Sequence, residues 1–354
     1  MSRPLRARIR RSALAHNLAV ARRLAPECRV MAVVKANGYG HGLLRAAAAF
    51  AEADAFAALE IEGAVRLREA GHRQEIVLIA GLFDTGELSI AAEHDLSLVV
   101  HHEEQVRMLE TSRARGLRVF LKINSGMNRL GFLPERAARV LARLEVCDAV
   151  AKVVLMTHFA DADDARGVAW QLERLQAIPE GGRRAWSLAN SAALIRYPKT
   201  RVGWVRPGIM LYGSSPFDDE TAQSLGLEPA MTLESRVIAV QELTPGERIG
   251  YGGTYTADAP LRVGIVACGY ADGYPRHAPG GTPILIGGQR TRTLGRVCMD
   301  VLFADLSRLP EAGVGTPVVL WGDGLPVEEV AAAAGTVGYE LLCALAPRVR
   351  IEDT

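Results

Sequence analysis

The first two thirds of the chain alternate short β-branched runs with longer runs rich in Ala, Leu, Glu and Arg. Two of the longer runs, residues 41–53 and 61–71, space their apolar residues by three and four, which predicts helices, with Gly71 ending the second. Strands that alternate with helices pair in parallel through right-handed crossovers. The eight strand candidates are residues 29–34, 55–59, 75–80, 96–100, 118–123, 152–157, 185–188 and 202–206.

Eight such units predict a closed (β/α)8 barrel of the TIM type. An open doubly wound sheet is the alternative, slightly weakened because the GxGxxG nucleotide fingerprint is absent. From about residue 213 a turn-rich segment reads as a linker, and Pro- and Gly-separated strand patterns follow it. We expect a barrel over residues 1–225 and a mostly β domain over 226–354, with residues 1–10 as a candidate addition to the β domain.

The charge, the apolar runs and the cysteine pattern of the sequence argue against several functional classes. A net charge of +1 on 354 residues gives no electrostatic reason to expect nucleic acid or a membrane surface as a partner. The basic N-terminus lacks a following apolar segment, and no apolar run approaches the roughly 20 residues of a membrane helix. The five dispersed cysteines favour free thiols in a cytoplasmic protein. No His, Cys or Asp spacing predicts a metal site.

Polar side chains gather where the predicted barrel strands end, which is where barrel enzymes do their chemistry. Lys35 has two interpretations there: a solvated rim lysine in an ion pair, or a desolvated amine that condenses with an aldehyde. The turns at residues 189–193 and 206–209 offer backbone N–H groups for a phosphate. Together with Lys35 they suggest pyridoxal 5′-phosphate, a phosphorylated aldehyde.

The segment VVKANGYGHG, residues 33–42, resembles the cofactor-lysine signature of alanine racemases. The resemblance extends along nearly the whole chain, and many separate matches in one order are far more specific than a lone KAN. The further matching segments are LKINSGMNRLGF (121–132), THFADAD (157–163), ANSAA (189–193), RPGIMLYG (206–213), IGYGGTY (249–255), GYADGYPR (269–276), GRVCMD (295–300) and GYELLCALAPRV (338–349).

The resemblance implies that Lys35 holds pyridoxal phosphate as an internal aldimine. Arg206 would face the pyridine nitrogen, and His158 would lie against the ring. Arg129 would contact the cofactor phenolate and the substrate carboxylate, oriented by Lys122, a residue often carbamylated in the family. The residues implied around the phosphate, with Asn190 as a further cofactor contact, are Tyr39, Ser191, Gly208, Ile209 and Tyr339.

The resemblance also implies a homodimer with shared active sites. Tyr251 would be the second acid/base, supplied by the other subunit. Met299, through its backbone, and Asp300 would line the substrate side from the partner, and Tyr270 would stand at the active-site entrance. The expected activity is interconversion of L- and D-alanine, for peptidoglycan or for alanine catabolism.

The chemistry of racemisation agrees with these roles. A proton must leave Cα from one face and return on the other, and one base on each face, Lys35 and Tyr251, is the simplest device. Both groups are mostly protonated at neutral pH and are therefore poor bases there, because their reference pKa values are roughly 10.4 and about 10. The site must favour their deprotonated forms. Arg206, whose guanidinium keeps its proton, cannot protonate a pyridine nitrogen, which disfavours side reactions.

Each of these residues also has a structural interpretation, as an ion-pair partner, a turn residue, a cap or a core side chain. Three rival functions remain from the sequence: a decarboxylase or broad-substrate racemase, a non-catalytic pyridoxal-phosphate carrier, and a metabolite-binding barrel that uses Lys35 only as a charge. Arg206 argues against a decarboxylase, and the β domain with Tyr251 argues against a carrier. His101, His102 and Glu60 receive no functional role.

Overall fold

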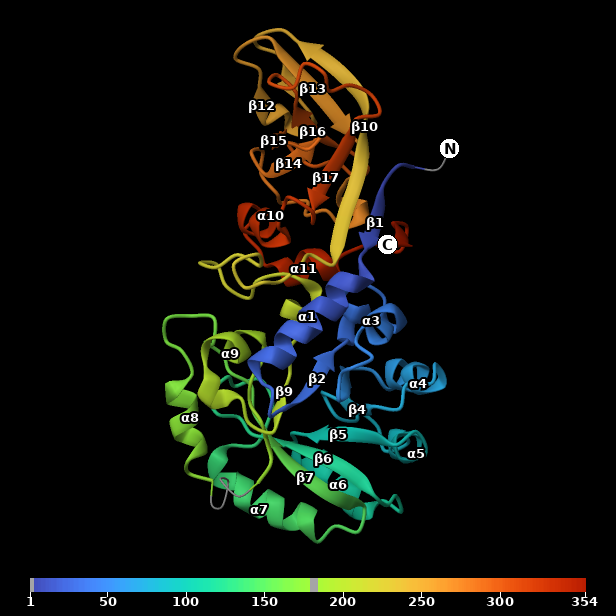
Figure 1. Ribbon diagram of the computed structural model, residues 1–354, viewed down its shortest axis with the longest axis vertical. Helices are drawn as coiled ribbons and strands as arrows, with labels where there is room; N and C mark the ends of the chain where they lie inside the picture. Colours follow the sequence, from blue (N-terminus) through green and yellow to red (C-terminus); the bar gives the residue numbers. More distant parts are fainter. Residues whose placement is uncertain (1–2, 179–183) are drawn as a thin grey trace. The chain divides into compact units, whose positions relative to one another are not determined.

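The computed structural model describes residues 3–178 and 184–354. These residues divide into two compact units (Figure 1). The barrel unit comprises residues 15–38 and 42–211, and the strand-rich unit comprises residues 3–14, 39–41 and 212–354. The boundary at residue 212 lies where the turn-rich segment begins, and no helix or strand occurs between residues 213 and 230.

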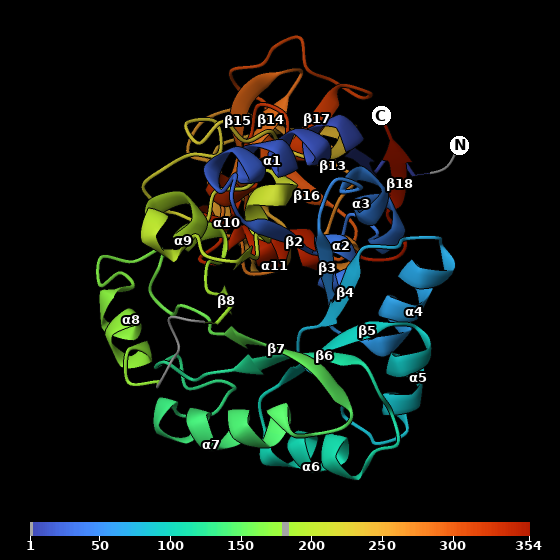
Figure 2. The same cartoon turned by 60° about the horizontal axis from the view of Figure 1, so that its bottom comes forward.

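The barrel unit contains a closed ring of eight parallel strands, so the predicted barrel is confirmed and the open sheet is wrong. The ring closes because β2 pairs with β9, through Arg29 beside Trp204 and Val30 beside Val205. Figure 2 shows helices on the outside of this ring. The strands are β2 (Arg29–Val33), β3 (Ala55–Ala58), β4 (Glu75–Leu78), β5 (Leu96–Val100), β6 (Leu117–Lys122), β7 (Val150–Met156), β8 (Trp186–Ser187) and β9 (Trp204–Val205).

The helices between these strands are amphipathic. In α7 (Pro134–Glu145), Pro134 occupies the first turn, and Ala137, Val140, Leu141 and Leu144 are buried at spacings of three and four. No helix among the described residues is long and apolar enough to span a membrane. The other helices up to residue 196 are α1 (Arg11–Leu24), α2 (Lys35–Tyr39), α3 (Leu43–Ala49), α4 (Ile61–Glu69), α5 (Glu87–Glu93), α6 (Glu103–Thr111), α8 (Ala169–Leu175) and α9 (Ser191–Arg196).

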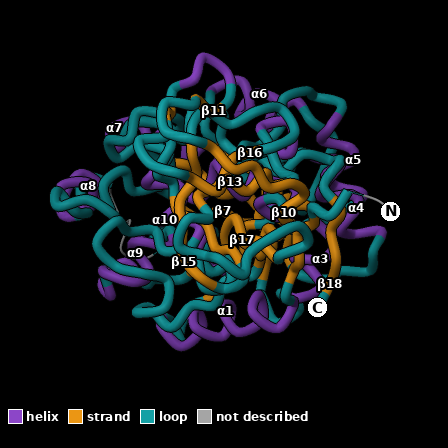
Figure 3. Tube along the Cα trace, turned by 90° about the horizontal axis from the view of Figure 1, so that it is seen from above, coloured by secondary structure: helices purple, strands orange, loops and turns teal. Residues whose placement is uncertain are grey.

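The strand-rich unit is built on an eight-stranded sheet in the order β13-β16-β15-β14-β17-β10-β1-β18. Its first strand, β1, pairs antiparallel with β10 and parallel with β18, which joins the start of the chain to its end. Figure 3 shows several of these strands in orange. The elements are β1 (Arg6–Ile9), β10 (Met231–Leu243), β11 (Arg248–Ile249), β12 (Tyr255–Thr256), β13 (Leu261–Val266), β14 (Pro283–Ile286), β15 (Gln289–Leu294), β16 (Leu302–Asp305), β17 (Pro317–Trp321), α10 (Val327–Ala333), α11 (Gly338–Cys343) and β18 (Arg350–Asp353).

Candidate active site

Lys35 follows β2 and begins a turn of unusual hand. Ala36, Asn37 and Gly38 have φ values of 52°, 52° and 60°, and Tyr39 follows at 47°. Left-handed backbone costs roughly 1–2 kcal/mol for each residue with a Cβ, so surrounding contacts must hold this turn. Two of them come from Asn37, whose Oδ1 accepts from Leu43 N at 2.9 Å and whose carbonyl accepts from Gly42 N at 2.8 Å. Asn tolerates this conformation better than other non-glycine residues.

Lys122 is the last residue of β6, and its side chain is buried. Burial, followed by the positive charges of Arg206, Arg129 and Lys35, lowers the pKa of the Lys122 ammonium to about 7. A large part of the Lys122 population is therefore a neutral amine at neutral pH. The same charge interactions show that these four residues of the barrel unit come together at the carboxyl ends of the strands.

Arg206 follows β9 and is almost fully buried. Its Nη1 donates to Ser187 Oγ at 2.6 Å, and its Nη2 donates to Thr157 O at 2.6 Å and to Leu188 O at 3.3 Å. Burial lowers the pKa of the guanidinium to about 10, which still leaves Arg206 charged at neutral pH. Its hydrogen bonds to these protein acceptors fix the direction of the buried charge.

His158 follows β7 and lies beside Arg206, with 3.5 Å between its Nδ1 and Arg206 Nη2. Burial, then the charges of Arg206, Lys122, Arg129 and Lys35, holds the pKa of the imidazole well below its usual range. His158 is therefore neutral at physiological pH, and its ring is a flat, uncharged surface among cations.

Ser191 is the first residue of α9, and its hydroxyl accepts from Gly208 N at 2.8 Å. This bond joins the α9 turn to the turn that precedes the 3-10 helix Ile209–Tyr212. One hydroxyl can accept and donate at once, so Ser191 can still donate to an anion. Asn190 is the N-cap of α9, where its Oδ1 accepts from Ala193 N at 3.0 Å.

The chemistry of this donor set fits a phosphorylated cofactor. The pKa values of Lys122 and His158 are lowered by the positive charges of their neighbours, which come from Lys35, Lys122, Arg129 and Arg206. An anion placed among these groups relieves the repulsion, and the Ser191 hydroxyl supplies a hydrogen bond. Groups of three or more His, Cys, Asp or Glu side chains that would hold a metal are absent from the described residues.

The residues expected from a partner subunit all belong to the strand-rich unit, and all four are exposed. Tyr251, in the 3-10 helix Tyr251–Gly253, is 71% exposed, and Met299 is 52% exposed. Tyr270 N donates to Cys298 O at 3.0 Å, which ties the Tyr270 turn to the segment that carries Met299 and Asp300.

Two contacts hold these two segments together. A Cβ on Gly269 would stand 2.3 Å from Cys298 O and 2.4 Å from Met299 O, so only glycine allows the close approach. Arg348 Nη2 donates to Asp300 Oδ1 at 2.7 Å, and Arg348 Nε donates to the buried Asp272 carboxylate at 2.7 Å. The carboxylate of Asp300 is therefore fixed in direction although it is exposed.

Three tyrosines of the strand-rich unit form an aromatic cluster. Tyr39 stacks on Tyr212 with 4.7 Å between ring centroids, and Tyr339 lies 5.9 Å from Tyr39. Burial raises the pKa values of Tyr39 and Tyr212, so both keep their hydroxyl protons and are hydrogen-bond donors at neutral pH. Neither is suited to act as a base.

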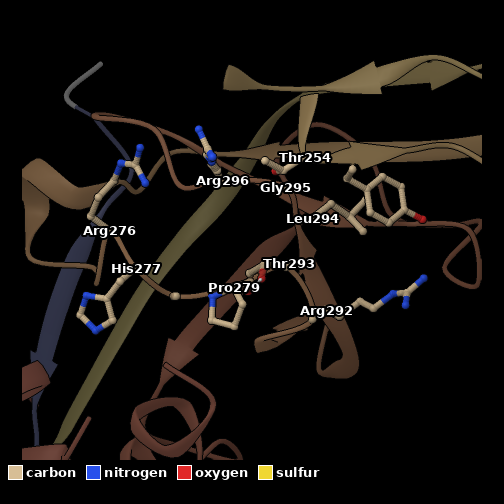
Figure 4. Close-up of a pocket in the computed structure, with 13 residues that line it drawn as sticks. Thr254, Arg276, His277, Pro279, Arg292, Thr293, Leu294, Gly295 and Arg296 are labelled. Atoms are coloured by element: carbon tan, nitrogen blue, oxygen red, sulfur yellow. Dashed lines mark hydrogen bonds between the residues drawn. The ribbon is translucent and has the colours of Figure 1, made fainter. Parts of the chain in front are cut away.

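A pocket of about 450 Å³ in the strand-rich unit has a basic lining (Figure 4). Arg276 and Arg292 lie at its opposite ends, with Pro279 and Thr293 between them. Arg292 is already paired with Asp305 at 3.2 Å. None of the predicted site residues lines this pocket.

The three residues without a sequence-based role occupy structural positions. His101 Nε2 bonds Ala80 O at 2.9 Å, and its backbone N–H donates to the buried Gln105 at 2.9 Å. The side chain of His102 caps α6 by accepting from Glu104 N at 3.3 Å, and Glu60 is the N-cap residue of α4.

Sequence reasoning overlooked Gln171 of α8, whose side chain is fully buried beside the His158 segment. Its only signal in the sequence is a polar residue on a helix face.

Comparisons with known proteins agree along the chain. Residues 9–216 match the family model described as alanine racemase, N-terminal domain, and residues 230–352 match alanine racemase, C-terminal domain. The chain is 58% identical over 354 residues to an alanine racemase of Nitrosospira multiformis, with 99% of each chain covered. It is 62% identical to one of Thiobacillus denitrificans, over 99% of this chain and 96% of that one. The biosynthetic alanine racemase of Pseudomonas aeruginosa superposes with a TM-score of 0.96 at 45% identity, covering 99% of both chains.

Proposed function

The chain belongs to the alanine racemase family, and we propose that it interconverts L- and D-alanine by a two-base mechanism with pyridoxal phosphate bound to Lys35. It is thus an isomerase, a racemase of alanine. The observation that carries the residue assignment is the convergence of Lys35, Lys122, Arg129 and Arg206 with a neutral His158 at the carboxyl ends of the barrel strands.

The cofactor would be held by groups already described. Lys35 would bond it, Ser191, Gly208 and Ile209 would hold its phosphate with Tyr39 and Tyr339, and Asn190 would support them. When bound, pyridoxal phosphate withdraws electrons from Cα of the amino acid and makes its proton acidic. The side chains of the protein would bind the substrate and move the Cα proton.

Lys35 and Tyr251 would remove and return the Cα proton on opposite faces. Tyr251 is 71% exposed on the strand-rich unit, which suits a residue offered to another subunit. We therefore propose a homodimer in which Tyr251, Met299, Asp300 and Tyr270 complete the partner's site. The carboxylate of alanine would be bound by Arg129.

Arg206 would hold a pyridine nitrogen without protonating it. With a pKa of about 10, its guanidinium keeps its proton at neutral pH and remains a hydrogen-bond donor. An unprotonated pyridine ring would withdraw fewer electrons from Cα. This favours return of the proton to Cα over decarboxylation or transamination. Arg206 therefore supports a racemase over a decarboxylase.

The function is tested with the purified protein, pyridoxal phosphate and L-alanine in deuterated water. We expect optical rotation to disappear while deuterium enters Cα of the D-alanine formed, with no keto acid or amine. Release of amine would indicate a decarboxylase. A yellow protein without exchange would indicate a carrier or another substrate, and a colourless protein would indicate a barrel that uses Lys35 only as a charge.

We further propose that Lys122 is carbamylated. The neutral amine, present because its pKa is about 7, attacks the carbon of CO2. A C–N bond forms, one C=O electron pair moves to oxygen, and the amine loses a proton to water. The carbamate carries a negative charge in place of the positive charge of the Lys122 ammonium, and this negative charge is attracted to Arg129 and Arg206.

The premise of a destabilised ammonium is tested by Lys122→Met in cofactor-free protein without CO2. The unfolded chain keeps the lysine proton to about pH 10.5, whereas the folded chain releases it near pH 7. The wild type therefore bears a cost below pH 7 that shrinks as the pH rises toward 10.5. We expect the variant to have a higher free energy of unfolding at pH 7, by on the order of 3 kcal/mol, in denaturant titrations.

The exposed Lys152 provides the control, since Lys152→Met should change stability by no more than about 0.5 kcal/mol. Equal stability of wild type and Lys122→Met at pH 7 would contradict the buried-amine premise. Adding ¹³C-labelled bicarbonate to the wild type then tests the modification itself, through a carbamate carbon resonance that Lys122→Met lacks.

The cellular setting is also a proposal. The five cysteines are present as thiols, which suits the reducing cytoplasm. The D-alanine formed there would serve peptidoglycan synthesis, or the enzyme would serve alanine catabolism in the reverse direction.

A further inference from the structure

Gln171 of α8 has a fully buried amide that joins two segments of the barrel unit. Its Nε2 donates to Ser125 Oγ at 2.8 Å and to His158 O at 3.1 Å. Its Oε1 accepts from Ala160 N at 2.7 Å. Both amide hydrogens and the amide oxygen are thus engaged, so the side chain has a single orientation.

The bond to Ser125 starts a chain of hydrogen bonds whose direction is fixed. Thr157 Oγ1 donates to the carbonyl of Ile123 at 2.8 Å, because a carbonyl can only accept. Ser125 Oγ must therefore donate to Thr157 Oγ1, 2.7 Å away, and receive from Gln171. The chain runs from Gln171 through Ser125 and Thr157 to the end of β6, among residues that are all buried.

Ser125 lies at the start of the loop that carries Arg129. Phe132 closes the base of this loop, because Phe132 N donates to Lys122 O at 2.9 Å and Phe132 O accepts from Asn124 N at 2.8 Å. A second contact from α8 supports the loop: a Cβ on Gly126 would stand 2.1 Å from the ring of Trp170. The helix thus contacts the Arg129 loop through two adjacent side chains.

The His158 segment is held from both sides. Thr157 O accepts from Arg206 Nη2 at 2.6 Å, and the next carbonyl, His158 O, accepts from Gln171. Trp170 Nε1 donates to Asp161 Oδ2 at 3.0 Å, three residues further along the same segment. The helix α8 therefore connects the segment beside Arg206 with the loop of Arg129.

We propose that Gln171 is a positioning residue for the reaction: it fixes the position of the Arg129 loop relative to the His158–Arg206 pair. Gln171 acts through the hydroxyls of Ser125 and Thr157 and the carbonyl of His158. The inference rests on the proposed function, in which Arg129 binds the substrate carboxylate and His158 lies against the cofactor ring. Losing the amide frees the loop and misplaces Arg129 while Lys35 and Tyr251 remain.

The test is Gln171→Met, which keeps the length of the side chain and removes its hydrogen bonds. We expect KM for alanine to rise about tenfold, as for the loss of a buried hydrogen-bonding group, with a smaller fall in kcat. In cofactor-free protein, we expect the amides of residues 124–131 to exchange hydrogen for deuterium faster, with exchange in β4 and β5 unchanged. Gln176→Met, an exposed glutamine just after α8, is the matched control and should behave as wild type.

Ser125→Ala interrupts the same chain of hydrogen bonds by removing the hydroxyl of its second residue. This variant tests the proposal if Gln171→Met fails to fold. In the double variant, the two effects on KM should be less than additive. KM and segment exchange both within twofold of wild type would overturn the proposal, as would faster exchange spread evenly over the barrel. Because exchange is measured without catalysis, it separates failure of this inference from failure of the wild type to racemise alanine.

Discussion

Replacing Tyr251 with Phe is expected to lower the rate of racemisation by about a thousandfold, because a positioned acid/base contributes roughly 10²–10⁴. The substitution removes one hydroxyl from a side chain that is 71% exposed, so stability and cofactor binding should stay close to wild type. The measurement is kcat in both directions, together with deuterium entry at Cα.

Deuterium entry distinguishes loss of one base from loss of the whole site. With Lys35 intact, Cα of one enantiomer should still exchange its proton without inversion. Tyr255→Phe, in the neighbouring β12, is the control and should remain within about twofold of wild type. Racemisation by Tyr251→Phe at a rate near that of wild type would remove the two-base assignment.

Mixing two inactive variants is expected to restore activity if the site is shared between subunits. One variant is Lys35→Ala, and the other is Tyr251→Phe. In a mixed dimer, the intact Lys35 of one subunit meets the intact Tyr251 of the other, so one of the two sites is complete. Random reassortment makes about half of the dimers mixed, and we expect about a quarter of wild-type activity.

The assay follows D-alanine after the two variants are refolded together. Lys35→Ala refolded with a variant that carries both substitutions is the control, because no pairing of those chains completes a site. No recovery in the first mixture, with mixed dimers present, would place Tyr251 in the site of its own subunit or outside the chemistry.

The barrel was predictable because its signals are local. Buried parallel strands are short β-branched runs, and the predicted starts of β2, β3, β4 and β5 coincide with the observed ones at residues 29, 55, 75 and 96. Boundaries were less accurate where glycine intervenes. The helix expected over residues 41–53 is only Leu43–Ala49, and it starts after Gly42, whose φ of 97° lies outside the helical range.

The left-handed backbone after Lys35 was not predicted from the sequence. Glycines punctuate it at residues 38 and 40, yet Ala36 and Tyr39 also adopt positive φ. No propensity favours that conformation in Ala or Tyr, and only contacts made elsewhere in the fold maintain it. Gln171 is a similar case, since a glutamine on a helix gives no sign of being buried.

The sequence alone determined the order of strands and helices, the change to a strand-rich second part, and which residues carry charges and nucleophiles. These properties depend on neighbours within a few positions along the chain. Only the tertiary structure decided that the pKa of Lys122 falls to about 7, that His158 is uncharged, and that Arg206 is fixed by three acceptors. Such properties arise from burial and from charges brought close by different strands, and their magnitude depends on distances through space that the order of residues does not contain.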